Sequence, residues 1–376
     1  MIRLLQKYGA YVFLFNNLLF SVSGYYGLAT NIFLILLAIF SFFTIFNSAF
    51  IKNAILDKSF NFYFLIILLN ILYFVLVEIN DFESFKFLLA KTVQLILFTS
   101  TIYFTYDKFK VNFLMFLKVI TLSSLFLSLM SSLPALDSRY LGIFYNPNEL
   151  SIIMVYGFAL FLFNYKKSFF NILIAICFLF VILATGSRSA LLAVFLALFI
   201  RFSFIKFLLI SLIGALISLT IFSNIQTIDR LQSEQLFFNR KYEILYALET
   251  LSNSLWFGYG LKNYAYIDKS LINFTDVSID FGAHNAYLST LVQYGLIFGT
   301  IYFSIMFRTL FKSFIHLKNR INFNSDYRML LFIVVYTMIN GFFENSFNGI
   351  NFFQSSLFWL TLGFLYYDSK VIKTSL

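Results

Sequence analysis

Hydrophobic and polar residues follow one another along this chain in long blocks, not in short alternation. Apolar runs of about 17–25 residues are long enough to cross the hydrocarbon of a bilayer as helices. The runs lack the period of two that marks outer-membrane strands. The sequence therefore predicts an all-α polytopic integral membrane protein, with residues 1–376 forming a single transmembrane domain. About twelve spans are expected, at approximately 8–25, 28–51, 60–79, 87–106, 111–133, 149–165, 168–186, 189–205, 207–223, 284–307, 329–343 and 352–367.

One polar interval, residues 224–283, is much longer than the others and lies between the ninth and tenth predicted spans. Within it, Ile244, Leu245, Leu248 and Leu251 recur at helical spacing. This pattern predicts an amphipathic helix on or near the membrane, with Arg240 in its first turn. We therefore expect one large extramembrane loop that contains amphipathic helices.

The composition agrees with a membrane protein, and the distribution of charge gives its orientation. Hydrophobic residues make up 60% of the chain, charged residues make up 12%, and the net charge is +10. If the N-terminus lies inside, most Lys and Arg residues fall on cytoplasmic loops, as the positive-inside rule requires. Both termini are then cytoplasmic and the interval 224–283 lies outside. The basic surplus is thus a topology signal, and no nucleic-acid partner is expected.

Residues suited to an anionic substrate gather on the predicted outer side. His284, one of two histidines, lies where the long interval returns to the bilayer. A guanidinium offers a rigid pair of donors that suits phosphate oxygens better than an ammonium does. The arginines predicted on this side are Arg139, Arg188, Arg230 and Arg240.

Each of these features also has a purely structural explanation. A lone histidine such as His284 is often held by the backbone, and an arginine at a membrane boundary, such as Arg188, often snorkels to the headgroups. The Asn-Pro-Asn turn predicts a helix that opens at about Asn148, which would act as its N-cap. The Gly-x-Gly at 258–260 is weak support for phosphate binding, because glycine also serves ordinary turns. His316, among basic residues, is expected on a solvated cytoplasmic face.

The order of the motifs resembles one known family. Thr-Gly-Ser-Arg188-Ser-Ala, Arg240 near the start of a loop helix, Gly-Tyr-Gly at 258–260 and His284-Asn-Ala-Tyr-Leu together resemble the bacterial O-antigen ligase and O-antigen polymerase (Wzy) superfamily. The stretch from Arg139 to Asn148 is similar to that family's upstream motif. The resemblance covers roughly residues 134–300. In ligases, the His-Asn pair is followed after nine residues by a glycine, and the third residue beyond that glycine is Gly, Thr or Tyr. In this chain the glycine is Gly295, but the third residue beyond it is Phe298.

The resemblance implies a metal-independent glycosyltransferase with a GT-C-like fold in the bacterial inner membrane, with its active site on the periplasmic face. Its donor would be a glycan on undecaprenyl pyrophosphate, and no cofactor is expected. Arg188 and Arg240 would stabilise the pyrophosphate leaving group, and His284 would be the general base on the acceptor hydroxyl. The substrate-binding residues that the resemblance implies are Arg139, Asn148, Asn285 and Tyr259.

Two acceptors and one other class of function stay open. A ligase passes the glycan to lipid A–core, and a polymerase passes it to another lipid-linked repeat unit. The single large loop before His284 favours the ligase. A flippase or transporter for lipid-linked oligosaccharide would favour ionisable residues along the bundle interior. Few are found within the predicted spans, chiefly Lys91 and Lys118.

Overall fold

The described part of the protein is helical. The computed structural model describes residues 2–46, 58–134, 138–164, 168–209, 235–268, 270, 282, 284–318, 320 and 324–374. Within these ranges, an isolated bridge between Val22 and Phe144 is the β-type pairing that forms. The helices are α1 (Ile2–Ser21), α2 (Tyr26–Phe46), the short 3-10 helix η2 (Lys58–Phe60), α4 (Asn61–Val77), α5 (Phe82–Ser131), α6 (Pro147–Phe163), α7 (Phe169–Thr185), α8 (Arg188–Arg201), α11 (Gln235–Asn253), α12 (Ala286–Lys318), α13 (Ser325–Asn340) and α14 (Phe353–Thr374).

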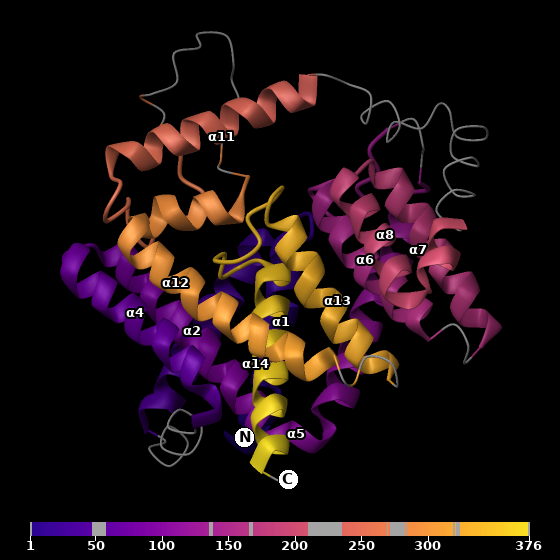
Figure 1. Cartoon of the computed structure of the whole chain (residues 1–376), viewed down its shortest axis with the longest axis horizontal. Coiled ribbons are helices and arrows are strands. Elements are labelled where there is room, and N and C mark those ends of the chain that lie inside the picture. Colours follow the sequence, from indigo (N-terminus) through magenta and orange to yellow (C-terminus); the bar gives the residue numbers. More distant parts are fainter. Residues whose placement is uncertain are drawn as a thin grey trace.

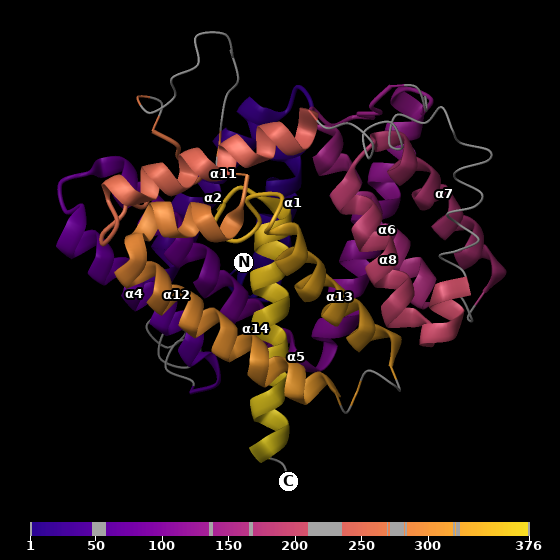
Figure 2. The same cartoon turned by 45° about the horizontal axis from the view of Figure 1, so that its top comes forward.

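The helices form a bundle with two distinct ends. Figure 1 shows α11 lying across one end, here named the α11 face, while both chain termini lie at the opposite end, named the termini face. Helices α6, α7 and α8 pack together on one side of the bundle. In Figure 2, α11 lies over the first part of α12. The predicted all-helical class is confirmed, while most of the ninth predicted span, 207–223, lies outside the described residues.

Helix α5 corrects one sequence prediction. Two spans, 87–106 and 111–133, were expected with a basic loop between them, but the chain is helical without interruption from Phe82 to Ser131. A straight helix of 50 residues would be about 75 Å long. Both of its ends nevertheless contact loops of the α11 face: the Ser84 hydroxyl accepts from the Lys262 backbone, and the Ser128 carbonyl accepts from Tyr140. The helix must therefore bend back near the termini face instead of ending in a loop.

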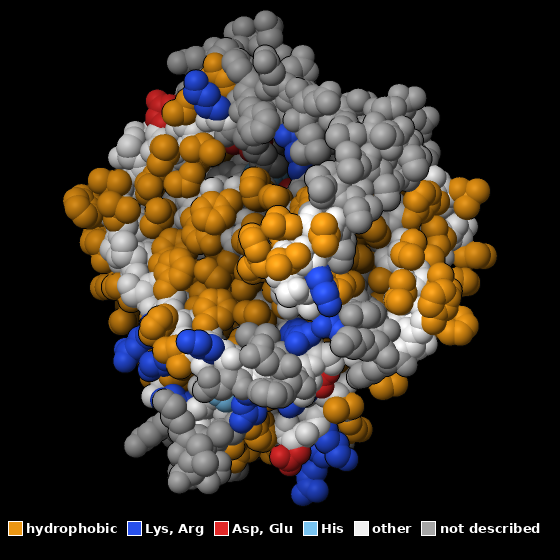
Figure 3. Space-filling model, turned by 45° about the vertical axis from the view of Figure 1, so that its right-hand side comes forward, with side chains coloured by type: hydrophobic (Ala, Val, Ile, Leu, Met, Phe, Trp, Pro, Cys, Tyr) orange, Lys and Arg blue, Asp and Glu red, His pale blue; other side chains and the backbone are white. Residues whose placement is uncertain are grey.

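Apolar surface and length agree with a membrane protein. Helices α5 and α12 are each long and apolar enough to cross a bilayer, and α4, α6 and α7 are shorter apolar helices. Figure 3 shows hydrophobic side chains across the middle of the molecule, with Lys and Arg gathered towards the termini face. The membrane assignment thus has structural support, whereas the count of twelve spans and the GT-C-like fold stay predictions.

The second histidine is buried, which contradicts the expected solvated face. His316 Nε2 lies 2.7 Å from an Asp368 carboxylate oxygen, and these side chains are only 13% and 5% exposed. Tyr106 and Tyr327 also donate to Asp368, at 2.7 and 2.8 Å. Of the basic residues near His316 in the sequence, Arg320 also lies 3.8 Å from this carboxylate, which therefore has the partners that a buried charge requires.

A glycine kink divides α12 into two helices. At Gly295 the backbone adopts φ 68° and ψ −179°, so that Ala286–Tyr294 forms a short helix set at an angle to the rest. The segment 255–260 runs beside the kink and uses its backbone groups: Tyr259 N donates to the Val292 carbonyl at 2.9 Å, and Leu296 N donates to the Leu255 carbonyl at 2.8 Å. Backbone donors and acceptors freed by a kink need such partners inside a membrane protein.

Gly295→Ala should destabilise the protein by about 2–4 kcal/mol. A Cβ at this position would lie 2.3 Å from the Trp256 carbonyl oxygen, and the positive φ disfavours any L side chain. Gly27→Ala is the matched control, because a Cβ there meets nothing within 4 Å and its φ is ordinary. Thermal unfolding in detergent would measure both variants. Equal melting temperatures would show that the kink does not depend on glycine.

Candidate functional site

The loop between α5 and α6 positions the first candidate residues. Asn148 was expected to cap α6, but the cap is Asn146, whose side-chain oxygen accepts from the Asn148 backbone at 2.8 Å. Pro147 then occupies the first helical position, where its missing N–H costs nothing. The side chain of Asn148 is consequently available for contacts outside its own helix.

Arg139 uses this side chain and the end of α7. Its Nη2 donates to Asn148 Oδ1 at 2.8 Å, and its Nε donates to the Thr185 carbonyl at 3.3 Å. The next residue, Tyr140, donates its backbone N–H to the Ala184 carbonyl at 3.0 Å. The loop that precedes α6 is thereby held against the C-terminus of α7, which is a favourable place for a cation.

Glu344 connects this loop to His284. Its Oε1 accepts from Asn148 Nδ2 at 3.0 Å, and its Oε2 lies 3.4 Å from His284 Nδ1. The His284 side chain is 39% exposed and the Glu344 side chain is 22% exposed. The structure thus joins His284, Glu344, Asn148 and Arg139 in one line of polar contacts, here named the outer polar chain.

Asn285 holds the start of the helix that follows His284. Its Oδ1 accepts from the backbone N–H groups of Tyr287 and Leu288, each at 3.0 Å, which makes it the N-terminal cap of α12. The Ala286 N–H donates to the Gly341 carbonyl at 2.7 Å and so ties this start to the end of α13. Asn285 was predicted to bind substrate, and the structure gives it a positioning role beside His284.

Arg188 lies at the neighbouring turn. Gly186, in the left-handed region at φ 64°, ends α7, and α8 begins at Arg188. This start is three residues beyond Thr185, whose carbonyl accepts from Arg139. The Arg188 side chain is half-buried. The tight turn therefore places the start of α8 beside the end of the outer polar chain.

Helix α11 carries the third predicted arginine. It begins at Gln235, so Arg240 lies in its second turn and not in its first, and its side chain lies outside the described residues. Tyr246 and Ala247 of α11 pack with Ile267, while Ile244, Leu245 and Leu248 are exposed. Of the predicted apolar face, these three residues are exposed whereas Leu251 is buried, and its contact with a membrane stays a prediction.

Tyr259 belongs to a different structural feature. It packs against Tyr266, with ring centroids 5.1 Å apart, and burial raises the pKa of its hydroxyl. Its backbone binds the kink of α12, and the flanking Gly258 leaves no room for a Cβ against Gly295. Close packing against the backbone of α12 therefore accounts for Gly258, and the nearby Glu78 side chain accounts for Gly260.

The same segment is fastened to the turn between α4 and α5. Glu78 Oε2 accepts from the Leu261 backbone at 2.8 Å, and Lys262 Nζ lies 2.6 Å from an Asp81 carboxylate oxygen. The Lys262 ammonium holds the pKa of Asp81 below its usual value. Part of the long interval, residues 255–262, is thus anchored to the bundle beside the kink of α12.

The outer polar chain lies where helices begin. Asn148 is in the first turn of α6, Arg188 starts α8 and His284 immediately precedes α12. Helix N-termini carry partial positive charge and free N–H groups, so they stabilise anions. With two guanidiniums nearby, this end of the molecule is suited to a phosphate-bearing substrate. Glu344 contacts Nδ1 of His284, and a partner on one ring nitrogen influences which nitrogen of a neutral imidazole carries the proton.

Glu344 is the residue that sequence reasoning missed. Its distance along the chain from His284 gave no sign of the contact. Its place in a short polar segment between two apolar runs, Asn-Gly-Phe-Phe-Glu-Asn-Ser, was a signal that could have selected it. Among the described residues, no group of three or more His, Cys, Asp or Glu side chains is arranged to hold a metal ion.

Comparison with protein families gives a match to part of the chain. No curated protein matches the chain. Residues 172–304 match the protein-family model described as O-antigen ligase. The matched segment includes Arg188, Arg240 and His284, whereas Arg139, Asn148 and Glu344 lie outside it. Over these residues the chain is similar to the O-antigen ligase family, in agreement with the resemblance that its motifs carry.

Proposed function

We propose that this protein is an O-antigen ligase, which transfers a glycan from undecaprenyl pyrophosphate to a hydroxyl of lipid A–core. The reaction takes place at the α11 face, which lies in the periplasm of a bacterium when both termini are cytoplasmic. The outer polar chain carries the proposal, because it puts a carboxylate-paired imidazole and an arginine in one line of contacts beside Arg188. The family match supports glycan transfer.

The proposed step is a displacement at the anomeric carbon. The acceptor oxygen forms the new glycosidic bond while the bond to the pyrophosphate oxygen breaks, and the pyrophosphate leaves with that electron pair. His284 Nε2 takes the proton of the acceptor hydroxyl. Arg188 and Arg240 bind the charge that develops on the pyrophosphate, without a metal ion. Arg139 holds Asn148 and the start of α6 in position for the donor.

The second candidate is an O-antigen polymerase, and Phe298 favours it. This residue stands where ligases carry Gly, Thr or Tyr, and it is buried edge-on against Tyr73, with ring centroids 5.0 Å apart. In the polymerase reaction the acceptor is another lipid-linked repeat unit, and the same residues perform the same displacement. A flippase is a weaker candidate, because the outer polar chain contains the groups that a transfer reaction needs.

Complementation distinguishes these functions. Cells that lack the endogenous gene would be supplied with the wild-type protein, and surface lipopolysaccharide and lipid-linked glycan would be separated by gel. A ligase restores lipid A–core carrying glycan, and without it polymerised lipid-linked glycan accumulates. A polymerase restores long chains where only single-repeat caps were present. If instead the cells without the protein accumulate lipid-linked glycan on the cytoplasmic face, and the wild-type protein relieves this accumulation, transport is the function and the proposed transfer is wrong.

Glu344→Gln should lower kcat by about 10- to 100-fold with little change in KM. The amide can still accept from Asn148, but it no longer favours the imidazolium form of His284. The acid limb of the pH–rate profile should therefore move to lower pH, which a purely structural loss would not produce. Glu83→Gln, an exposed carboxylate at the same end of the molecule, is the control. An unchanged pH profile in Glu344→Gln would remove Glu344 from the mechanism.

A further inference from the structure

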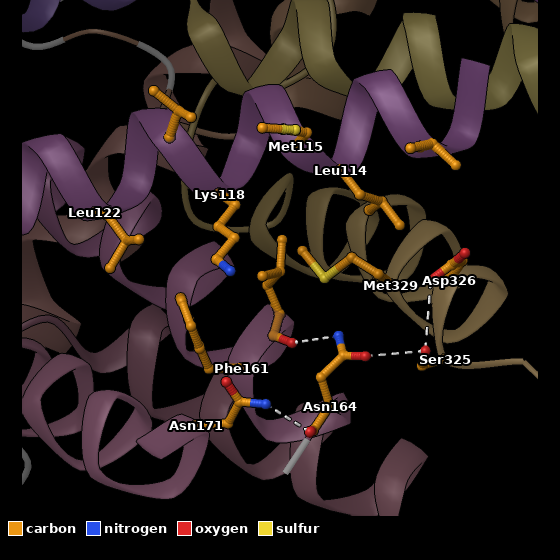
Figure 4. Close-up of a pocket in the computed structure, with 13 residues that line it drawn as sticks. Leu114, Met115, Lys118, Leu122, Phe161, Asn164, Asn171, Ser325, Asp326 and Met329 are labelled. Carbon is orange, nitrogen blue, oxygen red and sulfur yellow. Dashed lines mark hydrogen bonds between the residues drawn. The ribbon is translucent and has the colours of Figure 1, made fainter. Parts of the chain in front are cut away.

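A groove near the termini face lies outside the proposed reaction. It has a volume of about 490 Å³ and lies between the second half of α5, the end of α6, the start of α7 and the start of α13. Cavities of this size hold small ligands or parts of larger ones. Figure 4 shows Lys118 reaching from α5 into it. We name it the Lys118 groove.

The amides of the groove are already bonded to one another. Asn164 Oδ1 accepts from the Ser325 hydroxyl at 3.1 Å, and the Asn164 carbonyl accepts from Asn171 Nδ2 at 2.7 Å (Figure 4). Asn164 Nδ2 in turn donates to the Leu160 carbonyl at 2.9 Å. These bonds hold the ends of α6, α7 and α13 together, so the polar side of the groove is a rigid surface.

Lys118 takes part in none of these hydrogen bonds. Its ammonium lies 5.5 Å from the ring centroid of Phe161, and among the described residues the structure gives it no ion pair. Asp326 also lines the groove, but Figure 4 places it on the far side, beyond Met329. An aromatic ring offers an ammonium only a modest interaction. The groove thus contains one positive charge whose compensation must come from elsewhere.

The outer rim of the groove is apolar and exposed. Val111, Met115 and Val119 of α5 are exposed by 65%, 66% and 53%. In a bilayer, an apolar hollow on such a surface fills with acyl chains, because water there is excluded. An ammonium at that depth is costly unless it pairs with an anion or reaches the headgroups. Acyl chains bring phosphates with them, and a phosphate is the complementary charge.

We propose that the Lys118 groove binds an anionic phospholipid from the leaflet at the termini face. The phosphate lies against the Lys118 ammonium, on the side where Asn164 and Ser325 bridge the helix ends. One acyl chain follows α5 past Val119 towards Leu122. The Lys and Arg residues gathered at this face make it the cytoplasmic side, where anionic lipids attract basic groups. This site is independent of the proposed transfer reaction.

Native mass spectrometry of the whole protein in detergent would test the site. Phosphatidylglycerol and phosphatidylcholine of the same chain length would be added in equal amounts, and the ratio of the two lipid adducts measured. The wild-type protein should prefer phosphatidylglycerol, and Lys118→Gln should lower the ratio by about fivefold, the effect of one basic group near a charged membrane surface. Lys118→Arg should retain the preference, because the charge is kept.

The matched control is Lys108→Gln, which removes the same charge from an exposed position of the same helix outside the groove. It should leave the ratio unchanged. An equal loss in both variants, or equal binding of both lipids by the wild type, would overturn the proposal. Displacement of bound phosphatidylglycerol by millimolar inorganic phosphate would also overturn it, because it would show a site for free phosphate. A dimer that dissociates in Lys118→Gln would show that a second copy of the chain fills the groove. Thermal unfolding would confirm that the variants are folded.

Discussion

His284→Gln should lower the rate of glycan transfer by about 10²- to 10⁴-fold, the usual contribution of a general base. Glutamine keeps a polar side chain at the start of α12 but cannot accept the proton of the acceptor hydroxyl. The measurement is the initial rate of transfer by purified protein in lipid, from a polyprenyl-pyrophosphate-linked glycan to the acceptor. The wild-type rate should fall at acid pH as the imidazole becomes protonated. The residual rate of the variant should not show this fall.

The other histidine of the chain provides the control. His316→Gln disturbs a buried pair with Asp368 near the termini face, so it is expected to cost stability but not the chemical step. Both variants would be compared at equal amounts of folded protein. A His284→Gln rate within tenfold of the wild type would exclude His284 as the base. A loss of transfer in His316→Gln, with folding intact, would move the reaction away from the outer polar chain.

Arg188→Ala should lower kcat by about 10²- to 10³-fold, as removal of one group that stabilises developing charge does in other enzymes. Arg188→Lys should recover only part of this loss, because an ammonium lacks the paired donors of a guanidinium. Steady-state rates with the purified donor would measure both. The effect should fall on kcat more than on KM, since the leaving-group charge is largest in the transition state.

Arg201, the last residue of the same helix, is the matched control for Arg188. Arg201→Ala removes an identical side chain from the opposite end of α8, where the proposed reaction does not take place. Its transfer rate should stay within a few-fold of the wild-type rate. Comparable losses in the two variants would mean that the guanidinium at Arg188 acts on the fold of α8, and a normal rate in Arg188→Ala would remove it from the site.

The helical class could be predicted from the sequence, because apolar runs of bilayer length have one physical explanation. The path of α5 could not. Lys108 and Lys110 suggested a loop, but a long side chain can reach a polar partner without leaving a helix, and Lys110 Nζ lies 3.4 Å from the Tyr327 hydroxyl. Hydropathy reports where a segment is polar and does not report whether its backbone unwinds.

The candidate site was predicted in part. Motif order selected Arg139, Asn148 and His284, and the structure joins these three. It did not select Glu344, which connects them, because a contact between loops far apart in sequence leaves no local pattern. Tyr259 was selected by its position between two glycines, and its substrate-binding role stays a prediction, while Gly258 packs against the kink of α12.

The kink at Gly295 also fixes the position of His284. The short helix Ala286–Tyr294 is held at one end by the segment 255–260 and ends at the other beside His284. Each residue of a helix turns the chain by roughly 100° and advances it by about 1.5 Å. One added or deleted residue in this helix would rotate His284 out of reach of Glu344 without substituting any residue of the site. The number of residues between the His-Asn pair and the glycine is therefore a requirement of the proposed site.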